Sequence, residues 1–346
     1  MATRDVWRIR KPGSLHTLNR ETEFLEPVPA GHARVAVSTI GLNFADIAAC
    51  LGLYSAAPRG SFVPGLEFAG MVEEVGRGVS RPAPGDHVIG LTRFGGYATH
   101  IDADPRYLHP LPAGWNFADG AAFPVQAITA WYAISELGAC KRGDAVLVQS
   151  AAGGVGLNAL AILRGIGARV VAAVGSERKA AFLVDHAGLE RRQIVVRDRR
   201  AFGAQIAEAL LANGMEGFNL VLDAVAGPFF EPAYRRLRPA GRMVIYGAAD
   251  LMPSGPRTNW PKLAARYLAR PRIDPVSMVS ANRSVMGFNL IWLWDQTERL
   301  AEAYAGLASY ISRPPHIGRR FSFAETPAAL RHLQSGSSVG KVVLEV

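Results

Sequence analysis

The sequence has only two cysteines, Cys50 and Cys140, among its 346 residues. Two thiols cannot build a disulfide framework or a zinc lobe with four thiolate ligands, and they fit a reducing compartment. No uncharged apolar stretch of about 18 residues occurs, and no apolar run follows Met1. We therefore expect a globular protein of the cytoplasm, without a secretory signal or a membrane span.

Lysine is also scarce, because only five of the 38 basic residues are lysine. The net charge of +9 therefore comes almost wholly from arginine. A clustered positive field attracts nucleic acid, but a base-stacking surface also needs aromatic side chains. The densest arginine group, within residues 191–200, contains no aromatic residue. We interpret the charge as a solvated face and expect no nucleic-acid partner.

What the sequence does have is a nucleotide-binding turn between an apolar strand and a helix. Residues 145–148 are apolar and lead into a glycine-rich run. Gly153 lets the backbone approach a pyrophosphate, Gly156 lets the helix pack close on the strand, and free N–H groups at the helix start face the phosphates. We expect the cofactor to bind at Ala152, Gly153, Gly154, Val155 and Gly156.

The tip of the next strand indicates which dinucleotide binds. Residues 170–174 form that strand, which ends at Gly175-Ser176, about twenty residues on, where an NAD site places an acidic residue. Ser176, Arg178 and Lys179 instead offer a hydroxyl and two cations, which suit a 2′-phosphate. The sequence therefore predicts NADPH as the cofactor.

The chain changes its rhythm near residue 125. Residues 1 to about 125 are short β segments broken by proline and glycine, and later strands alternate with helices. Such alternation predicts an α/β fold with a parallel sheet. We expect its strands at about 145–150, 170–175, 193–196, 219–224 and 242–247.

Two later segments are harder to interpret. Residues 250–283 contain five prolines around a short basic helix near residues 263–268, which can be a lid over a substrate, a surface-contact helix or a plain connection. Residues 285–294 are strongly apolar, and a hydrophobic sheet edge is an aggregation hazard unless it is covered. We expect a homodimer that pairs the strand at residues 284–294.

An ordered set of motifs runs nearly end to end through the chain. It includes Gly41-Leu42-Asn43-Phe44-Ala45-Asp46, Pro64-Gly65-Leu66-Glu67, Pro84-Gly85-Asp86-His87-Val88, Thr129-Ala130-Trp131-Tyr132 and Gly340-Lys341-Val342-Val343-Leu344. This order resembles the medium-chain dehydrogenases/reductases, specifically their zinc-free quinone oxidoreductase and zeta-crystallin group. Tyr246-Gly247-Ala248-Ala249 and Ala281-Asn282-Arg283 are most similar to the vesicle amine transport protein branch.

The resemblance implies two domains with the active site in the cleft between them. Residues 1–125 and 313–346 are expected to form a GroES-like catalytic domain, and residues 126–312 an inserted Rossmann NADPH-binding domain. Zinc-dependent relatives have a Cys at the position of Asn43 and a His at the position of Leu66. Because both ligands are missing and the eight histidines show no ligand spacing, we expect no metal.

A site without a Lewis acid favours conjugated acceptors, whose negative charge delocalises onto an oxygen that needs only a donor. We expect an NADPH-dependent oxidoreductase that transfers hydride to a quinone or an α,β-unsaturated carbonyl. The alternatives are an enoyl-thioester reductase and a weakly catalytic NADPH-binding protein with a structural or membrane-associated role.

The resemblance also implies roles for individual residues. Tyr54 corresponds to the acid of related enoyl-thioester reductases, or else it only packs on the cleft wall. Asn43 corresponds to a residue at the nicotinamide end, or else it only caps a helix. Lys341 faces the cofactor or is a surface charge. The further cofactor positions that the resemblance implies are Thr129, Arg197, Gly247, Phe288 and Asn289.

Overall fold

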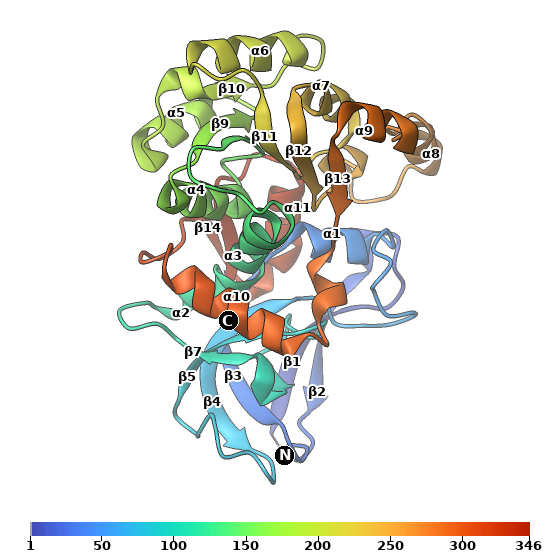
Figure 1. The fold of residues 1–346 in the computed structure, drawn as a ribbon. Coiled ribbons are helices and arrows are strands. Elements are labelled where there is room, and N and C mark those ends of the chain that lie inside the picture. The colour runs from blue at the N-terminus through green and yellow to red at the C-terminus, as the bar shows by residue number, and fades with distance from the viewer. Residues whose placement is uncertain (1) are drawn as a thin grey trace.

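A computed structural model describes residues 2–346, and its two large sheets lie at opposite ends of the molecule (Figure 1). The six-stranded sheet is parallel throughout, with the strand order β10-β9-β8-β11-β12-β13. The predicted α/β class and the parallel sheet are confirmed. The strands are β8 (Ala145–Gln149), β9 (Arg169–Val174), β10 (Ile194–Val196), β11 (Phe218–Asp223), β12 (Leu237–Ile245) and β13 (Ser284–Gly287).

Helices cover both faces of this sheet because its central strand is apolar on both sides. In β8, Val146 and Val148 pack into one core with helix α4, whereas Ala145 and Leu147 pack into a second core with helix α6. Alternate side chains of a strand point to opposite faces, so a strand buried on both sides is mostly apolar, and in β8 only the last residue, Gln149, is polar. The helices of this part are α3 (Pro124–Trp131), α4 (Gly154–Ile166), α5 (Glu177–Ala187), α6 (Phe202–Ala212), α7 (Phe230–Arg235), α8 (Trp260–Leu268), α9 (Pro275–Ala281) and α10 (Thr297–Ala308).

The second large sheet is built from both ends of the chain. Its order is β14-β15-β3-β4-β5-β7, with β6 paired to β3, and it is mostly antiparallel. Its strands are β3 (Ala33–Gly41), β4 (Glu67–Val75), β5 (His87–Leu91), β6 (His100–Ala103), β7 (Leu108–Pro110), β14 (Ile317–Ser322) and β15 (Lys341–Glu345). Helices α1 (Phe44–Cys50), α2 (Phe117–Ala121) and α11 (Thr326–Gln334) belong to the same part.

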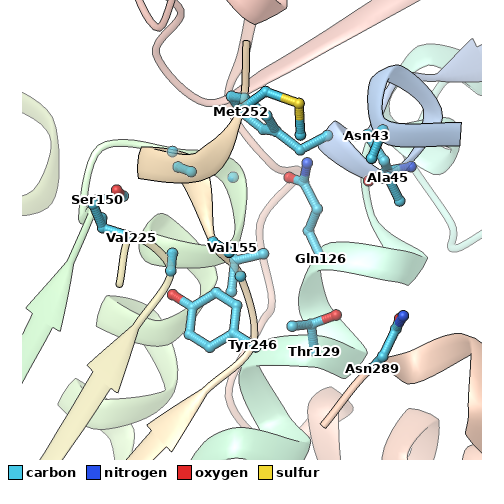
Figure 2. A pocket seen from close by; sticks show the side chains of 18 of the residues that line it. Asn43, Ala45, Gln126, Thr129, Ser150, Val155, Val225, Tyr246, Met252 and Asn289 are labelled. Carbon is cyan, nitrogen blue, oxygen red and sulfur yellow. The ribbon is translucent and has the colours of Figure 1, made fainter. Parts of the chain in front are cut away.

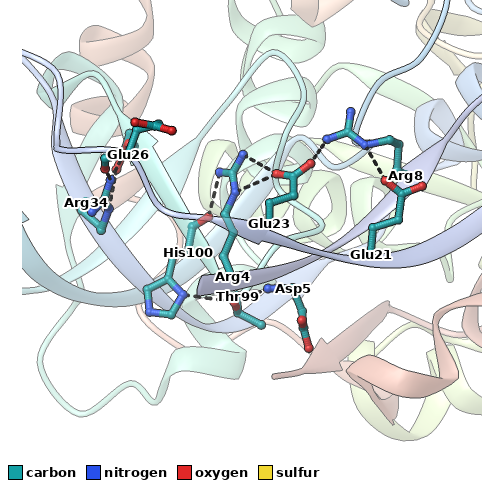
Figure 3. A network of polar contacts seen from close by, with 10 residues as sticks. Arg4, Asp5, Arg8, Glu21, Glu23, Glu26, Arg34, Thr99 and His100 are labelled. Carbon is teal, nitrogen blue, oxygen red and sulfur yellow. Dashed lines mark hydrogen bonds and ion pairs between the residues drawn. The ribbon is translucent and has the colours of Figure 1, made fainter. Parts of the chain in front are cut away.

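Strands β1 (Thr3–Ile9) and β2 (Leu18–Phe24) form a separate antiparallel ribbon. Figure 3 shows the ion pairs along it: Arg4 pairs with Glu23 at 3.1 Å, and Arg8 bridges Glu23 and Glu21. These pairs are partly exposed, so each contributes at most about 1 kcal/mol. They set the register of the ribbon more than its stability.

The two parts meet where the C-terminal segment reaches the glycine-rich turn. The Gly340 N–H donates to the Ala152 carbonyl at 2.8 Å, and Gly153 and Gly340 form an isolated parallel bridge. Gly340 has φ 61°, and a Cβ at this position would lie 2.3 Å from the His316 carbonyl oxygen. Only glycine therefore lets the chain pass this close to the turn.

The structure differs from the sequence prediction at residues 284–294. The edge strand β13 ends at Gly287, and Leu290–Leu293 form a 3₁₀ turn. The chain leaves the sheet because its apolar side chains pack inward: Trp294 stacks on Tyr107 with ring centres 3.9 Å apart, and Phe288 packs against the core.

Among the helices of residues 2–346, none combines the length and the apolar composition that a membrane-spanning helix needs.

Candidate functional site

A cavity of about 1240 Å³ lies between the two parts of the molecule (Figure 2). It is lined by α1, α3, the turn before α4, the carboxyl ends of the parallel strands and α8. Such an edge is where open α/β sheets place their ligands. The predicted site residues on this lining are Asn43, Tyr54, Thr129, Ala152, Gly153, Gly154, Val155, Gly156, Lys179, Arg197, Gly247, Phe288 and Asn289.

The glycine-rich turn forms one wall of the cavity. Gly153 is the N-cap of α4, and its neighbours Gly154 and Val155 open the first turn, whose N–H groups have no partner within the helix. A Cβ on Gly156 would lie 2.5 Å from the Ala151 carbonyl oxygen, so only glycine lets α4 pack this close to β8. The turn therefore presents bare backbone donors to the cavity, as a phosphate-binding helix terminus requires.

Two cations lie at the strand tips beside this turn. Lys179, in the first turn of α5, and Arg197, after β10, both line the cavity, and neither forms an ion pair within residues 2–346. The Lys179 Nζ donates to the Gly336 carbonyl at 2.6 Å, and Arg197 reaches the Ser150 hydroxyl at 3.4 Å. Burial lowers the pKa of Lys179 to about 8, and the nearby Arg197 and Arg178 contribute to this shift. Two close cations without a carboxylate form an anion site.

Two other predicted cofactor residues lie off this lining. The Ser176 hydroxyl caps α5 by accepting the Lys179 N–H at 3.4 Å. The exposed Arg178 turns outward and donates to the Ser337 carbonyl. Glu177, the acidic residue of this turn, pairs with Arg191 at 3.1 Å. The carboxylate that follows the tip of β9 in the sequence is therefore already paired, and Asp250, which lines the cavity, is paired with Arg199.

The opposite end of the cavity holds Tyr54 and Asn289. The Tyr54 hydroxyl donates to Asn289 Oδ1 at 2.8 Å. Burial raises the pKa of Tyr54 to about 12, and the Asn289 hydrogen bond opposes this shift only in part. The phenol is therefore protonated at neutral pH and able to donate. Thr129 lies nearby on α3 (Figure 2), where its hydroxyl donates to the Val125 carbonyl at 2.6 Å.

Asn43 is held by a buried ion pair beneath the cavity floor. Its Nδ2 donates to Glu67 Oε1 at 2.7 Å, and its Oδ1 accepts from the Lys341 Nζ at 3.0 Å. Lys341 also pairs with Glu67, and both side chains are almost fully buried. The second Glu67 oxygen accepts the Val125 N–H at 2.8 Å. Lys341, which was expected at the cofactor or on the surface, is therefore internal and does not line the cavity.

This donor set does not suit zinc. At the two positions where zinc-dependent relatives have ligands, this chain has the amide of Asn43 and the aliphatic side chain of Leu66. The ammonium of Lys341 also contacts Asn43 directly. Zinc prefers thiolate, imidazole and carboxylate ligands, and a buried ammonium repels a second cation. Among the residues that the structure describes, no cluster of three or more His, Cys, Asp or Glu side chains has a ligand arrangement.

The sequence prediction named neither Gln126 nor Tyr246 as a site residue, and it left the role of residues 250–283 open. Gln126 points into the cavity from α3 (Figure 2), and its Oε1 is buried without a hydrogen-bond partner in residues 2–346. Tyr246 follows β12, and burial raises the pKa of its phenol. Helix α8 contributes Trp260 and Leu263. Tyr246 lies one residue before the predicted Gly247, and α8 corresponds to the helix that was expected near residues 263–268.

The residues present fit a dinucleotide with an extra phosphate. The turn at Gly153 supplies backbone donors, and Lys179 and Arg197 supply cations without a carboxylate partner. The buried, unpaired Gln126 Oε1 supplies an acceptor between these groups and Asn43. A Cβ on Gly247 would lie 2.8 Å from the Ala224 carbonyl oxygen, so only glycine lets the ends of β11 and β12 lie this close together at the cavity.

The buried ion pair yields a stability prediction. Lys341→Met leaves the Glu67 carboxylate buried and unpaired, so we expect the free energy of unfolding to fall by about 3–5 kcal/mol in urea denaturation. Glu67→Gln/Lys341→Met removes both charges and should recover part of this loss. Arg320→Met breaks the exposed Arg320–Glu345 pair, at 2.7 Å, and should cost at most about 1 kcal/mol. A Lys341→Met protein as stable as Arg320→Met would contradict the assignment.

Two sequence families match the chain. The alcohol dehydrogenase GroES-like domain matches residues 29–113, and the zinc-binding dehydrogenase family matches residues 193–344. The first covers strands of the mostly antiparallel sheet, and the second covers part of the parallel sheet and the C-terminal return.

Known proteins match over nearly the whole chain. The human synaptic vesicle membrane protein VAT-1 homolog is 30% identical over 92% of this chain and 80% of its own length, and the chain spans 64% of the Danio rerio homolog. The quinone oxidoreductase-like protein 2 of Bos taurus is 31% identical over 92% of this chain and 86% of its own.

Solved structures agree with these relatives. The quinone oxidoreductase from Thermus thermophilus, solved also with NADPH, has 30% identity and a TM-score of 0.75 over 99% of this chain and 100% of its own. The CurK enoyl reductase has 26% identity and a TM-score of 0.80 over 99% of each chain. The chain therefore belongs to the medium-chain dehydrogenase/reductase family and shares its GroES-like and Rossmann-type architecture.

Proposed function

We propose that this protein is an NADPH-dependent oxidoreductase that reduces a quinone or an α,β-unsaturated carbonyl without zinc. One observation carries the proposal: Lys179 and Arg197 line the cavity at the strand tips with no carboxylate partner among residues 2–346. A site for NADH places an acidic side chain at this edge to bind the ribose hydroxyl groups. Here Glu177 is paired with Arg191 instead.

The turn and the strand tips would hold the cofactor. The Gly153 N–H donates to the Ser150 carbonyl at 2.9 Å, so the backbone N–H groups of Gly154 and Val155 would bind the pyrophosphate. Lys179, Arg197 and the Ser150 hydroxyl would bind the 2′-phosphate. Gly247 and Thr129 border the far end of the cavity, where the nicotinamide would lie. When bound, this group supplies a hydride to a conjugated acceptor.

The chain's own residues answer the charge that develops on the acceptor oxygen. The Tyr54 hydroxyl is protonated at neutral pH, because its pKa lies at about 12. Asn289 orients it by accepting at 2.8 Å. A phenol has a single O–H, so Tyr54 would turn from Asn289 to the acceptor oxygen in order to donate. There it would stabilise the oxyanion and pass it a proton, and water would then reprotonate the phenolate. Asn43 is held by Glu67 and Lys341 and serves as a fixed wall.

An enoyl-thioester reductase is a second candidate for the same site. The CurK enoyl reductase shares 26% identity with this chain over 99% of its length. The cavity of about 1240 Å³ exceeds the roughly 300–1000 Å³ of ordinary ligand pockets, as expected of a site that holds a cofactor and an acyl substrate together.

We also propose a homodimer through the edge of the parallel sheet. Strand β13 has no neighbour on its outer side in the described chain. The preceding helix α9 exposes Val276 and Val279, at 72% and 81% of their surface. An open strand edge beside exposed apolar side chains favours pairing with a second copy.

The basic end of the cavity predicts the cofactor preference and its pH dependence. Lys179 is protonated below its pKa of about 8 and loses its charge above it. Because charge-assisted hydrogen bonds contribute about 1.5–3 kcal/mol, we expect NADPH to bind more than about tenfold tighter than NADH at about pH 7. This ratio should fall as the pH rises through the pKa of Lys179, as measured by titration calorimetry.

Two variants isolate this effect. Lys179→Met should lower the preference and remove its pH dependence. Arg178→Met, in the same helical turn but directed at Ser337, should leave the preference at about pH 7 within about twofold, because Arg178 does not line the cavity. Since Arg178 helps to lower the pKa of Lys179, the fall of the ratio should move to higher pH in this variant but should not disappear. Equal dissociation constants for NADPH and NADH in the unmodified protein would refute the proposed cofactor.

An NADPH-oxidation screen over quinones, enones and enoyl thioesters tests the reaction. On the best acceptor, Tyr54→Phe should lower kcat by about 100-fold, as expected for a lost general acid. Titration of Tyr54 should not change the kcat of the unmodified enzyme near neutral pH, because the phenol has a pKa of about 12. An unchanged kcat in Tyr54→Phe would assign Tyr54 to packing, and no turnover with any acceptor would favour a non-catalytic role.

Light scattering tests the dimer. We expect a mass twice that of the 37.1 kDa chain. Val276→Lys/Val279→Lys should shift the protein toward monomer, because charges would enter the paired face. Leu211→Lys, at an equally exposed position on α6, should not. A single-chain mass at all concentrations would rule out the dimer.

A further inference from the structure

A second, smaller cavity of about 210 Å³ lies beside the main one. The two cavities share Leu251 and Leu263, so these side chains lie between them. The walls of the smaller cavity carry Arg257, Lys262 and Arg266. None of the predicted site residues touches it.

The three cations have no carboxylate partner in the described part of the chain. Neither Asp nor Glu contributes to the lining. The neighbouring Asp250 is already paired with Arg199, and only its backbone carbonyl accepts from Arg266, at 2.8 Å. Three positive charges around a cavity of this size therefore leave most of their donors free for an anion.

Helix α8 divides an apolar surface from this cationic cavity. It directs Trp260, Leu263 and Tyr267 to the main cavity, although Trp260 and Tyr267 keep 59% and 53% of their surface exposed. One turn apart, Lys262 and Arg266 line the smaller cavity. The start of the helix is close to the end of α1, because Thr258 donates to the Leu51 carbonyl at 3.4 Å, and Leu51 precedes Tyr54 in the same loop.

The cofactor does not need these cations. Its pyrophosphate is assigned to the turn at Gly153, and its 2′-phosphate to Lys179 and Arg197. An anion at Lys262 must therefore come from another molecule in the cleft. A ligand with its reacting end at Tyr54, an uncharged arm along α8 and a phosphate at the far end matches all three surfaces.

We propose that Arg257, Lys262 and Arg266 bind the phosphate of an enoyl thioester carried on a phosphopantetheine arm. The proposal rests on the proposed function and deepens it, because it selects thioesters over quinones as the substrate class. The arm lies on Trp260 and Tyr267, and its phosphate accepts hydrogen bonds from the three cations. A quinone has no group for this cavity.

Two substrates that differ by one phosphate provide the test. Crotonyl-4′-phosphopantetheine should have a KM at least about tenfold below that of crotonyl-pantetheine, with equal kcat, because the phosphate acts only in binding. Arg257→Gln/Lys262→Gln should reduce this KM ratio severalfold, and adding Arg266→Gln should bring it close to one. The control Arg272→Gln/Arg313→Gln removes two exposed charges that line neither cavity and should keep the ratio.

Each other outcome overturns the assignment. Equal KM values for the two thioesters in the unmodified protein would remove the phosphate site. If Arg257→Gln/Lys262→Gln weakens NADPH binding but leaves the ratio of the two thioester KM values unchanged, the cavity binds the cofactor instead. A third outcome is that the unmodified protein binds phosphatidylglycerol vesicles and shows no preference for the phosphorylated thioester. If Arg257→Gln/Lys262→Gln then abolishes vesicle binding, the cavity is a site for a lipid headgroup.

A binding measurement separates this proposal from the proposed function. Calorimetry with 4′-phosphopantetheine and pantetheine alone requires no turnover. A preference for the phosphorylated arm that disappears in Arg257→Gln/Lys262→Gln supports the site even if no acceptor is reduced. The absence of that preference in an active enzyme refutes the site and leaves the proposed reaction intact.

Discussion

The buried charge of Lys341 is the constraint on which the site depends. An ammonium removed from water is tolerated only when opposite charge and hydrogen bonds replace the solvent. Here one carboxylate, Glu67, accepts from Lys341, from the Asn43 amide and from the Val125 N–H. These groups belong to β15, β4, the start of α1 and the start of α3. One ion pair therefore fixes four elements that border the cleft.

The cleft above this ion pair has opposite chemical character at its two ends. Lys179 and Arg197 make one end cationic, whereas Tyr54 presents a neutral phenol at the other. The cationic end can hold a charged group without placing that charge near the reacting atoms. The phenol remains able to donate because burial disfavours its ionised form. An acceptor that needs a proton or a hydrogen bond, rather than a metal ion, fits this arrangement.

Sequence reasoning succeeded where the signal is local. The strand, turn and helix from residue 145 to 166 could be predicted because glycines at fixed spacing and an apolar strand determine them together. It could not place Lys341, because the partner Glu67 lies 274 residues away. It could not separate Arg178 from Lys179, since adjacent helical residues point in different directions and the loop at residues 336–337 receives each one differently. It also extended β13 too far, because apolar composition does not distinguish a sheet edge from a turn packed on Tyr107.

The C-terminal segment explains why these long-range features belong together. Within residues 336–341, Gly336 accepts from Lys179, Ser337 accepts from Arg178, and Gly340 donates to Ala152 in the glycine-rich turn. The next residue, Lys341, makes the buried ion pair. One short segment therefore contacts the cationic end, the glycine-rich turn and the cleft floor at once. Because it returns from the far end of the chain, the cationic side of the cleft is complete only when both parts of the molecule are folded and packed together.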